Sequence, residues 1–220
     1  ARDLSKIEAN RATYLEIESG DEKRLSLDAG YITIYNGRRV AKLEEDMLYD
    51  AGSTIRFLDN DRDDTYEIVI VDQYRYGIVS TVDFVGGTIG LRDNKQQQAA
   101  QAISLGDAEG FSTVQESDGS SLELFELAQG DVVAVRQSKD LALTQVIRCG
   151  DSVFGTITAI NKDLDTIEID GETFYLTEYF KEQYLESLSP GAPGTFTLGI
   201  NRALVSADAQ SAGFSYGFLT

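Results

Sequence analysis

The sequence of 220 residues contains no histidine and no tryptophan, one cysteine and two prolines. Histidine is the commonest general base at neutral pH and the commonest ligand of transition metals, so its absence argues against both kinds of site. The single cysteine, Cys149, cannot form a disulfide bond within the chain. A serine or cysteine nucleophile would lack its ordinary activating partner, and we therefore do not expect an enzyme.

Long apolar runs and positive charge are also scarce. No run reaches the roughly 18 residues that a membrane-spanning helix needs, so no membrane span is expected in this chain. There are 19 Lys and Arg residues against 37 Asp and Glu residues, which gives a net charge of −18. Such a surface repels phosphate backbones and suits a cation-rich setting, so nucleic acid is not an expected partner.

An internal repeat is the strongest positive signal in the sequence. The stretch Tyr76–Arg92 lies over Phe154–Asp170 without a gap when it is shifted by 78 positions. The matching pairs share size and polarity: Gly77 and Gly155, Val79 and Ile157, Val82 and Ile160, Thr88 and Thr166, Ile89 and Ile167, and Leu91 and Ile169. Repeats of this kind usually mark one structural unit per copy.

Two further matches extend the repeat. A looser copy, Ser5–Glu18, places Leu15 on Ile167 and Ile17 on Ile169. The runs that close the first two units, Gly52–Phe57 and Tyr66–Val69, fall on Gly130–Val135 and Thr144–Ile147 with the same shift. We therefore expect three tandem modules, 1–76, 77–150 and 151–212, with 213–220 as the opening strand of a further module or an interaction tail.

Each module reads as all-β. Short alternating runs such as Tyr31–Tyr35, separated by turn signals such as Asn36-Gly37 and Asp170-Gly171, predict five or six strands per module in a small barrel-like arrangement with short helical turns. The best helix candidate is Tyr179–Ser187, and the polar run Asn94–Gln101 is expected to be a loop or short helix. The alternative is one continuous sandwich over all 220 residues.

One acidic loop has the pattern of a cation site. Asp59, Asp61, Asp63 and Glu67 place carboxylates at every second position with a further acid at the ninth, which can wrap oxygen ligands around Ca²⁺. The full EF-hand pattern fails, because Asp64 replaces the glycine at position six and the bidentate Glu at position twelve is also missing. The alternative is a solvated acidic hairpin tip without an ion.

Two other clusters have competing interpretations. The adjacent Arg38 and Arg39 suit a soluble hairpin or an ion pair with Glu44 or Glu45. Tyr74, Arg75 and Tyr76 either stack on a sugar or link the first module to the second. The match of Tyr76 to Phe154 favours the linking role.

Three stretches, Tyr31–Val40, Ile55–Asp72 and Thr156–Leu176, resemble the β-repeat regions of Gram-positive cell-surface proteins of the kind that carry S-layer homology domains. The end of the chain, GFSYGFLT, resembles the strand that opens the next module in such proteins. In that family the acidic loop is nearer to D-x-D-x-D-G, with a glycine where Asp64 stands here. The resemblance implies an extracellular, cell-surface location and a structural role as spacer, lattice or adhesion segment.

The expected function is therefore structural: a segment of a bacterial surface-layer, appendage or envelope-associated protein that self-associates or acts as a spacer. The expected partners are other copies of the chain, other envelope proteins or a cell-wall polysaccharide. Two alternatives stay open, a structural protein of a phage tail or virion and a carbohydrate-binding accessory region of a secreted hydrolase. An exposed aromatic platform would favour the carbohydrate-binding alternative, whereas self-association through open strand edges or through GFSYGFLT would favour the lattice or filament function.

Overall fold

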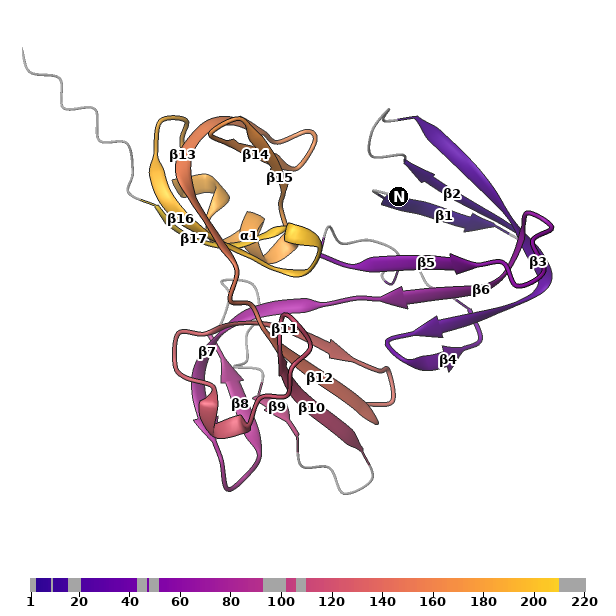
Figure 1. The fold of residues 1–220 in the computed structure, drawn as a ribbon, viewed down its shortest axis with the longest axis horizontal. Helices are drawn as coiled ribbons and strands as arrows, with labels where there is room; N and C mark the ends of the chain where they lie inside the picture. The colour runs from indigo at the N-terminus through magenta and orange to yellow at the C-terminus, as the bar shows by residue number, and fades with distance from the viewer. Residues whose placement is uncertain are drawn as a thin grey trace, which may run out of the picture.

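The computed structural model describes residues 3–8, 10–15, 21–42, 47, 52–92, 102–105 and 110–209. The fold is all-β, as predicted, and consists of three sheets that follow one another along the chain (Figure 1). We refer to β1 to β6 as module 1, β7 to β12 as module 2 and β13 to β17 as module 3. The predicted loop or helix at Asn94–Gln101 and the tail 213–220 lie outside the described residues.

Module 1 contains a sheet of six strands in the order β1-β2-β3-β6-β5, and β4 pairs with the end of β3. The strands are β1 (Asp3–Glu8), β2 (Arg11–Leu15), β3 (Glu22–Tyr35), β4 (Arg38–Val40), β5 (Thr54–Leu58) and β6 (Thr65–Asp72). The long strand β3 joins the two halves of the sheet, because it pairs antiparallel with β2 and then parallel with β6.

Module 2 has the strand order β10-β12-β11-β7-β8-β9. The strands are β7 (Arg75–Asp83), β8 (Thr88–Leu91), β9 (Ala102–Ser104), β10 (Phe111–Glu116), β11 (Val132–Gln137) and β12 (Leu143–Arg148). A single 3₁₀ turn, η2 (Leu124–Glu126), lies between β10 and β11.

Module 3 has the strand order β15-β14-β13-β16-β17. The strands are β13 (Ser152–Asn161), β14 (Thr166–Ile169), β15 (Glu172–Tyr175), β16 (Pro193–Leu198) and β17 (Leu204–Ala209). The predicted helix is present as α1 (Glu178–Gln183) followed by η3 (Leu185–Ser187), and η4 (Ile200–Arg202) connects β16 to β17. The Thr177 hydroxyl caps α1 by accepting the Phe180 N–H at 3.1 Å.

The sheets do not close into barrels, so the predicted barrel-like arrangement was too strong a description. In module 3 the strands follow the order third, second, first, fourth and fifth, with the helix between the third and fourth strands. Leu176, at the end of the third strand, makes a parallel bridge to Leu204 of the fifth. This is the strand order of the OB-fold, a partly open five-stranded Greek-key barrel. The fold alone implies no particular function.

The predicted repeat is present residue by residue. Val79 pairs with Leu91 and Ile157 pairs with Ile169, and both hairpins contain a bulge at the next residue, Ser80 or Thr158. The hydroxyl of Ser80 donates to the Gly90 carbonyl at 2.9 Å, and that of Thr158 donates to the corresponding Glu168 carbonyl at 3.2 Å. A short hydroxyl side chain therefore stabilises the same bulge in both modules.

The looser copy at the start is also present, but its alignment was displaced by three residues. The β1–β2 hairpin has its register shift between Leu4 and Lys6, and Ile7 then pairs with Ala12. Ala12, which is fully buried, thus takes the place of Ile167, which the sequence alignment assigned to Leu15. The core residue at this position is an isoleucine in module 3 and an alanine in module 1. The alignment by apolar pattern therefore selected the larger Leu15 in place of Ala12.

Both predicted hairpin turns are confirmed. Asn36 and Gly37 have φ values of 46° and 82°, and Asp170 and Gly171 have φ values of 48° and 90°. Positive φ at both central positions is the type I′ geometry that matches the twist of the flanking strands. These turns connect β3 to β4 and β14 to β15.

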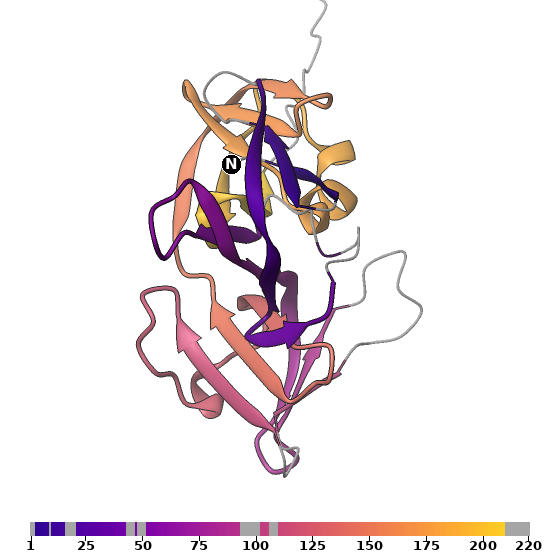
Figure 2. The same ribbon diagram turned by 90° about the vertical axis from the view of Figure 1, so that its right-hand side faces the viewer.

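Each module has its own apolar core, and a fourth cluster lies between modules (Figure 2 shows module 2 below module 3). The largest buried side chains of module 3 are Phe180 and Phe196. The fourth cluster combines residues at both ends of module 2 with residues of module 3: Tyr74, Tyr76, Val132, Ala134, Ile147, Cys149 and Val205, with Tyr179 and Ile200 packed against them. Modules 2 and 3 therefore share a continuous apolar contact.

Candidate functional site

The four predicted metal ligands converge on one point. Asp59, Asp61 and Asp63 lie in the loop between β5 and β6, and Glu67 lies near the start of β6, at the end of module 1 that is remote from the other modules (Figure 1). One oxygen each of Asp59, Asp61, Asp63 and Glu67 lies within 4.8 Å of all the others. Within the described part of the chain this is the acidic group with the geometry to hold a metal ion.

Backbone amides of the loop hold three of these carboxylates in place. The Asp59 carboxylate accepts the N–H groups of Arg62 at 2.6 Å and Asp64 at 3.1 Å. Glu67 accepts the N–H of Asn60 at 2.9 Å. Asp63 accepts the N–H of Thr65 at 2.8 Å, so the loop folds back on its own acidic side chains.

The residue at position six of the loop adopts the backbone conformation of the glycine that it replaces. Asp64 has φ of 64°, in the left-handed region that glycine occupies most readily and that aspartate tolerates better than most residues. Arg62 has φ of 65° as well. The missing glycine therefore does not prevent the sharp turn of the loop.

The spread of the oxygens is compatible with a single cation. Two oxygen ligands of one Ca²⁺ at about 2.3–2.6 Å can be up to about 5 Å apart, and the four oxygens here all lie within 4.8 Å of one another. Repulsion from Asp63, with a small contribution from desolvation and from Glu67 and Asp59, raises the pKa of Asp61, as expected where a cation would offset crowded negative charge.

Tyr76 connects all three modules. Its hydroxyl donates to the Gly52 carbonyl of module 1 at 3.2 Å and accepts the Ile200 N–H of module 3 at 3.1 Å. A Cβ atom on Gly52 would lie 2.4 Å from the ring, and one on Gly199 would lie 2.6 Å from it. The ring therefore occupies space that only glycine leaves free on both sides.

The burial of Tyr74 and Tyr76 decides between their two predicted roles, stacking on a sugar and linking the modules. Tyr74 is 9% exposed and Tyr76 is 4% exposed. Neither ring is accessible for stacking on a sugar, and both contribute to the cluster between modules. The linking role is therefore correct, and it reaches module 3 as well as modules 1 and 2.

The contact between modules 1 and 2 is mainly polar. Asp72, which is 5% exposed, pairs with Arg56 at 3.1 Å and with Arg136 of module 2. Asn36 of the first hairpin donates from Nδ2 to the Gln137 carbonyl at 2.6 Å. A buried carboxylate with two guanidinium partners fixes the relative orientation of the modules, because removing either partner leaves charge unpaired.

Arg38 belongs to the same contact. Its guanidinium pairs with Asp140 of module 2 at 2.9 Å, whereas the predicted partners Glu44 and Glu45 lie outside the described residues. The Ser138 hydroxyl, the Ala142 N–H and Arg38 lower the pKa of Asp140 to about 2. Sequence reasoning missed this contact because the partners are 102 positions apart.

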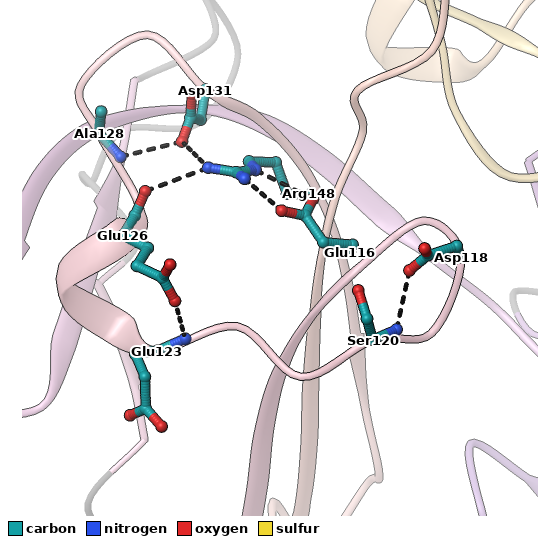
Figure 3. Close-up of polar contacts among 8 residues, drawn as sticks. All are labelled: Glu116, Asp118, Ser120, Glu123, Glu126, Ala128, Asp131 and Arg148. Carbon is teal, nitrogen blue, oxygen red and sulfur yellow. Dashed lines mark hydrogen bonds and ion pairs between the residues drawn. The ribbon is translucent and has the colours of Figure 1, made fainter.

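Arg148 organises the polar face of module 2 (Figure 3). Its guanidinium forms two hydrogen bonds with Glu116, one of them from Nε at 3.0 Å, and also donates to the Glu126 carbonyl at 3.1 Å. Asp131 lies 3.7 Å away and accepts the Ala128 N–H at 2.9 Å. These contacts hold η2 and β10 against β12, which favours a structural role for this arginine.

Cys149 is buried in the cluster between modules 2 and 3. Desolvation raises the pKa of its thiol to about 12. A thiol in this environment is a weak nucleophile, in line with the sequence-based expectation that it packs as a small apolar side chain.

The chain was compared with known proteins. No protein-family model matches it, and no curated protein matches it. Among the described residues, no helix has the length and apolar character needed to cross a membrane.

Proposed function

We propose that this chain is a structural segment of a bacterial surface-layer, appendage or envelope-associated protein, located outside the cell, and that it acts as a spacer and self-associates. The observation that supports this role best is the Tyr76 junction, where one ring contacts glycine residues of modules 1 and 3. A tyrosine enclosed in this way resists rotation of one module against the next. A chain of modules held in fixed orientation suits a spacer.

Calcium would stabilise this segment through the loop of Asp59, Asp61, Asp63 and Glu67. The convergence of four carboxylates with alternate spacing supports a Ca²⁺ site, and a net charge of −18 suits a surrounding rich in divalent cations. The loop closes the β5–β6 hairpin, so an ion there would rigidify the end of module 1. An ion at this position would stabilise the fold and would not take part in catalysis.

Sedimentation velocity over a concentration series, in CaCl₂ and in EGTA, tests the proposal. The expected result is a rise in the weight-average sedimentation coefficient with protein concentration in calcium. A chain that stays monomeric at every concentration in both buffers contradicts self-association. A glycan-binding screen run in parallel tests the polysaccharide partner, for which exposed aromatic rings would be required.

A further inference from the structure

The turn Asn36-Gly37 has a chemical reactivity that its role as a hairpin turn does not use. Asn36 is the one asparagine of the sequence that is followed by glycine. Asparagine is a chemically labile residue, and in this dipeptide the backbone nitrogen of the glycine can attack the side-chain amide of the asparagine. Glycine leaves this attack unhindered because it has no Cβ atom. The dipeptide therefore has the chemistry of a site of spontaneous modification.

The reaction is a deamidation, and its atoms balance with water as the only co-reactant. The Gly37 nitrogen loses its proton to water and bonds to Cγ of Asn36. The bond between Cγ and Nδ2 breaks, and Nδ2 takes up a proton from water and leaves as ammonia. Water then opens the resulting cyclic imide at either of its carbonyl carbons, which gives aspartate or isoaspartate.

The folded protein restrains the side-chain amide of Asn36. The residue is 4% exposed. Its Nδ2, the leaving group of the reaction, donates to the Gln137 carbonyl of module 2 at 2.6 Å, and its Oδ1 accepts the Gln73 N–H at 2.8 Å. Two hydrogen bonds thus fix the orientation of the amide, and the one to module 2 also holds the group that has to leave.

The backbone of the turn is restrained as well. Asn36 and Gly37 have the φ values of 46° and 82° that a type I′ turn requires, and the Asn36 N–H donates to the Val71 carbonyl at 2.9 Å. Module 2 covers the turn, since a Cβ atom on Gly37 would lie 2.9 Å from Cδ1 of Leu143. Closing the imide ring disturbs the backbone of Asn36, which a hydrogen-bonded and covered turn resists.

We propose that Asn36-Gly37 is a deamidation site that the contact between modules 1 and 2 keeps unreactive. This contact is mainly polar, and one ion pair across it joins Asp72 to Arg136 of module 2. A contact with few buried apolar side chains opens at a lower free energy than an apolar core. Each opening frees the Asn36 amide, so the rate of deamidation measures how often the contact opens. The inference is independent of the proposed function, because it concerns contacts within one chain.

The modification prevents the contact from forming again. In the aspartate product the oxygen that replaces Nδ2 carries no proton, so it faces the Gln137 carbonyl as a second acceptor. The product also adds negative charge to a chain whose net charge is already −18. In the isoaspartate product the backbone runs through the side chain, which displaces the turn further. Deamidation thus converts a reversible opening of the contact into a permanent one, without an enzyme.

Deamidation of the full chain is followed in mildly alkaline buffer by peptide mapping with mass spectrometry, which assigns each new carboxylate to a residue. We expect Asn36 of the wild-type protein to react at least about tenfold more slowly in native buffer than in guanidinium chloride. In the denatured chain it should react before the other asparagines. Equal rates in the folded and the denatured protein, or earlier reaction of another asparagine in the denatured chain, would overturn the inference.

Arg136→Gln tests whether module 2 provides the protection. The substitution removes a partner of Asp72 without changing the sequence around Asn36, and deamidation should be at least about fivefold faster than in the wild-type protein. Arg24→Gln is the matched control, because Arg24 pairs with Glu22 at 3.0 Å on the surface of module 1. The control should react at the wild-type rate. Equal rates in the two variants would show that the turn alone protects the amide and that the proposal is wrong.

A denaturant series on the wild-type protein decides the question if Arg136→Gln does not fold. Opening one contact exposes less surface than unfolding a module, so the rate should rise at denaturant concentrations below the unfolding transition. A rate that rises only with the transition, as followed by circular dichroism, contradicts control by the contact. Asn36→Asp, which reproduces one product, should have a larger radius of gyration than the wild-type protein in small-angle scattering. An unchanged radius contradicts the permanent opening.

Discussion

The hydroxyl of Tyr76 accepts a hydrogen bond from the backbone N–H of Ile200 at 3.1 Å, although the two residues are 124 positions apart. The same hydroxyl donates to Gly52, so one atom contacts modules 1 and 3 from its place in module 2. The corresponding residue of module 3, Phe154, is 77% exposed. Equivalent positions in the repeat therefore differ in their surroundings, and the contact between modules 1 and 2 is not repeated between modules 2 and 3.

Removing the Tyr76 hydroxyl tests this contact. Tyr76→Phe keeps the ring but removes the hydrogen bonds of its hydroxyl with the Ile200 N–H and the Gly52 carbonyl, which should lower the free energy of unfolding by about 1–3 kcal/mol. Urea unfolding measures the change. Tyr66→Phe is the matched control, because Tyr66 keeps its ring contact with Phe57 and its hydroxyl makes no side-chain hydrogen bond among the described residues. A loss of equal size in both variants would contradict the special role of Tyr76.

The glycine on the module 3 side should not tolerate a side chain. In Gly199→Ala the new Cβ would lie 2.5 Å from Val205 and 2.6 Å from the Tyr76 ring. Overpacking of this kind costs about 1–3 kcal/mol, which thermal unfolding would detect as a lower melting temperature. Gly150→Ala, where no atom lies within 4 Å of the added Cβ, should leave the melting temperature nearly unchanged. An unchanged melting temperature in Gly199→Ala would show that the junction is loosely packed.

The contact between Arg38 and Asp140 should depend on pH in the acid range. Because the pKa of Asp140 is lowered to about 2, its contribution to stability is present above the ordinary carboxyl pKa of about 4 and is lost as the pH falls towards 2. Carboxyl carbon NMR should record a midpoint near pH 2. Ser138→Ala removes the strongest of the hydrogen bonds that lower the pKa and should move the midpoint upward. A midpoint near pH 4 in the wild-type protein would contradict this contact.

Calcium should raise the melting temperature through specific carboxylates. A ligand that binds only the native state stabilises it by mass action, by about 2.7 kcal/mol at 100 times its dissociation constant. We expect thermal unfolding in millimolar CaCl₂ to occur at higher temperature than in EGTA, and Asp61→Asn to remove most of that difference.

Asp64→Asn provides the control for the calcium experiment. It removes the same charge from the same loop, and asparagine tolerates the positive φ of this position, but Asp64 is not one of the four convergent carboxylates. The calcium-dependent shift should survive in this variant. If both variants lose the calcium-dependent shift equally, the effect of calcium depends only on net charge. If calcium does not shift the melting temperature of the wild-type protein, the metal site is ruled out.

Local chemistry explains what the sequence predicted well. Turn residues with intrinsic preference for positive φ, such as Asn36-Gly37 and Asp170-Gly171, specified their hairpins directly. The shift of 78 positions between Val79 and Ile157 carried over to the register of both hairpins. The spacing of four acids in one short loop was sufficient to place them together.

Contacts between modules could not be predicted in the same way. Arg38 and Asp140 carry no signal that they are partners, and the sequence offered nearby glutamates instead. The register of the β1–β2 hairpin was missed because the small Ala12 concealed the alignment of these strands with the other modules. Contacts between residues far apart in the sequence depend on how the modules are oriented. The pattern of residues within one short stretch does not specify that orientation.

Small-angle X-ray scattering tests the central claim, that the three modules form one body of fixed orientation around Tyr76. The wild-type chain, measured at low concentration and compared with Tyr76→Ala, should give the bell-shaped normalised Kratky profile of a rigid particle. The variant should give a larger radius of gyration and the raised profile of modules that move independently. A wild-type profile already characteristic of independent modules, or identical profiles for both proteins, would contradict the account.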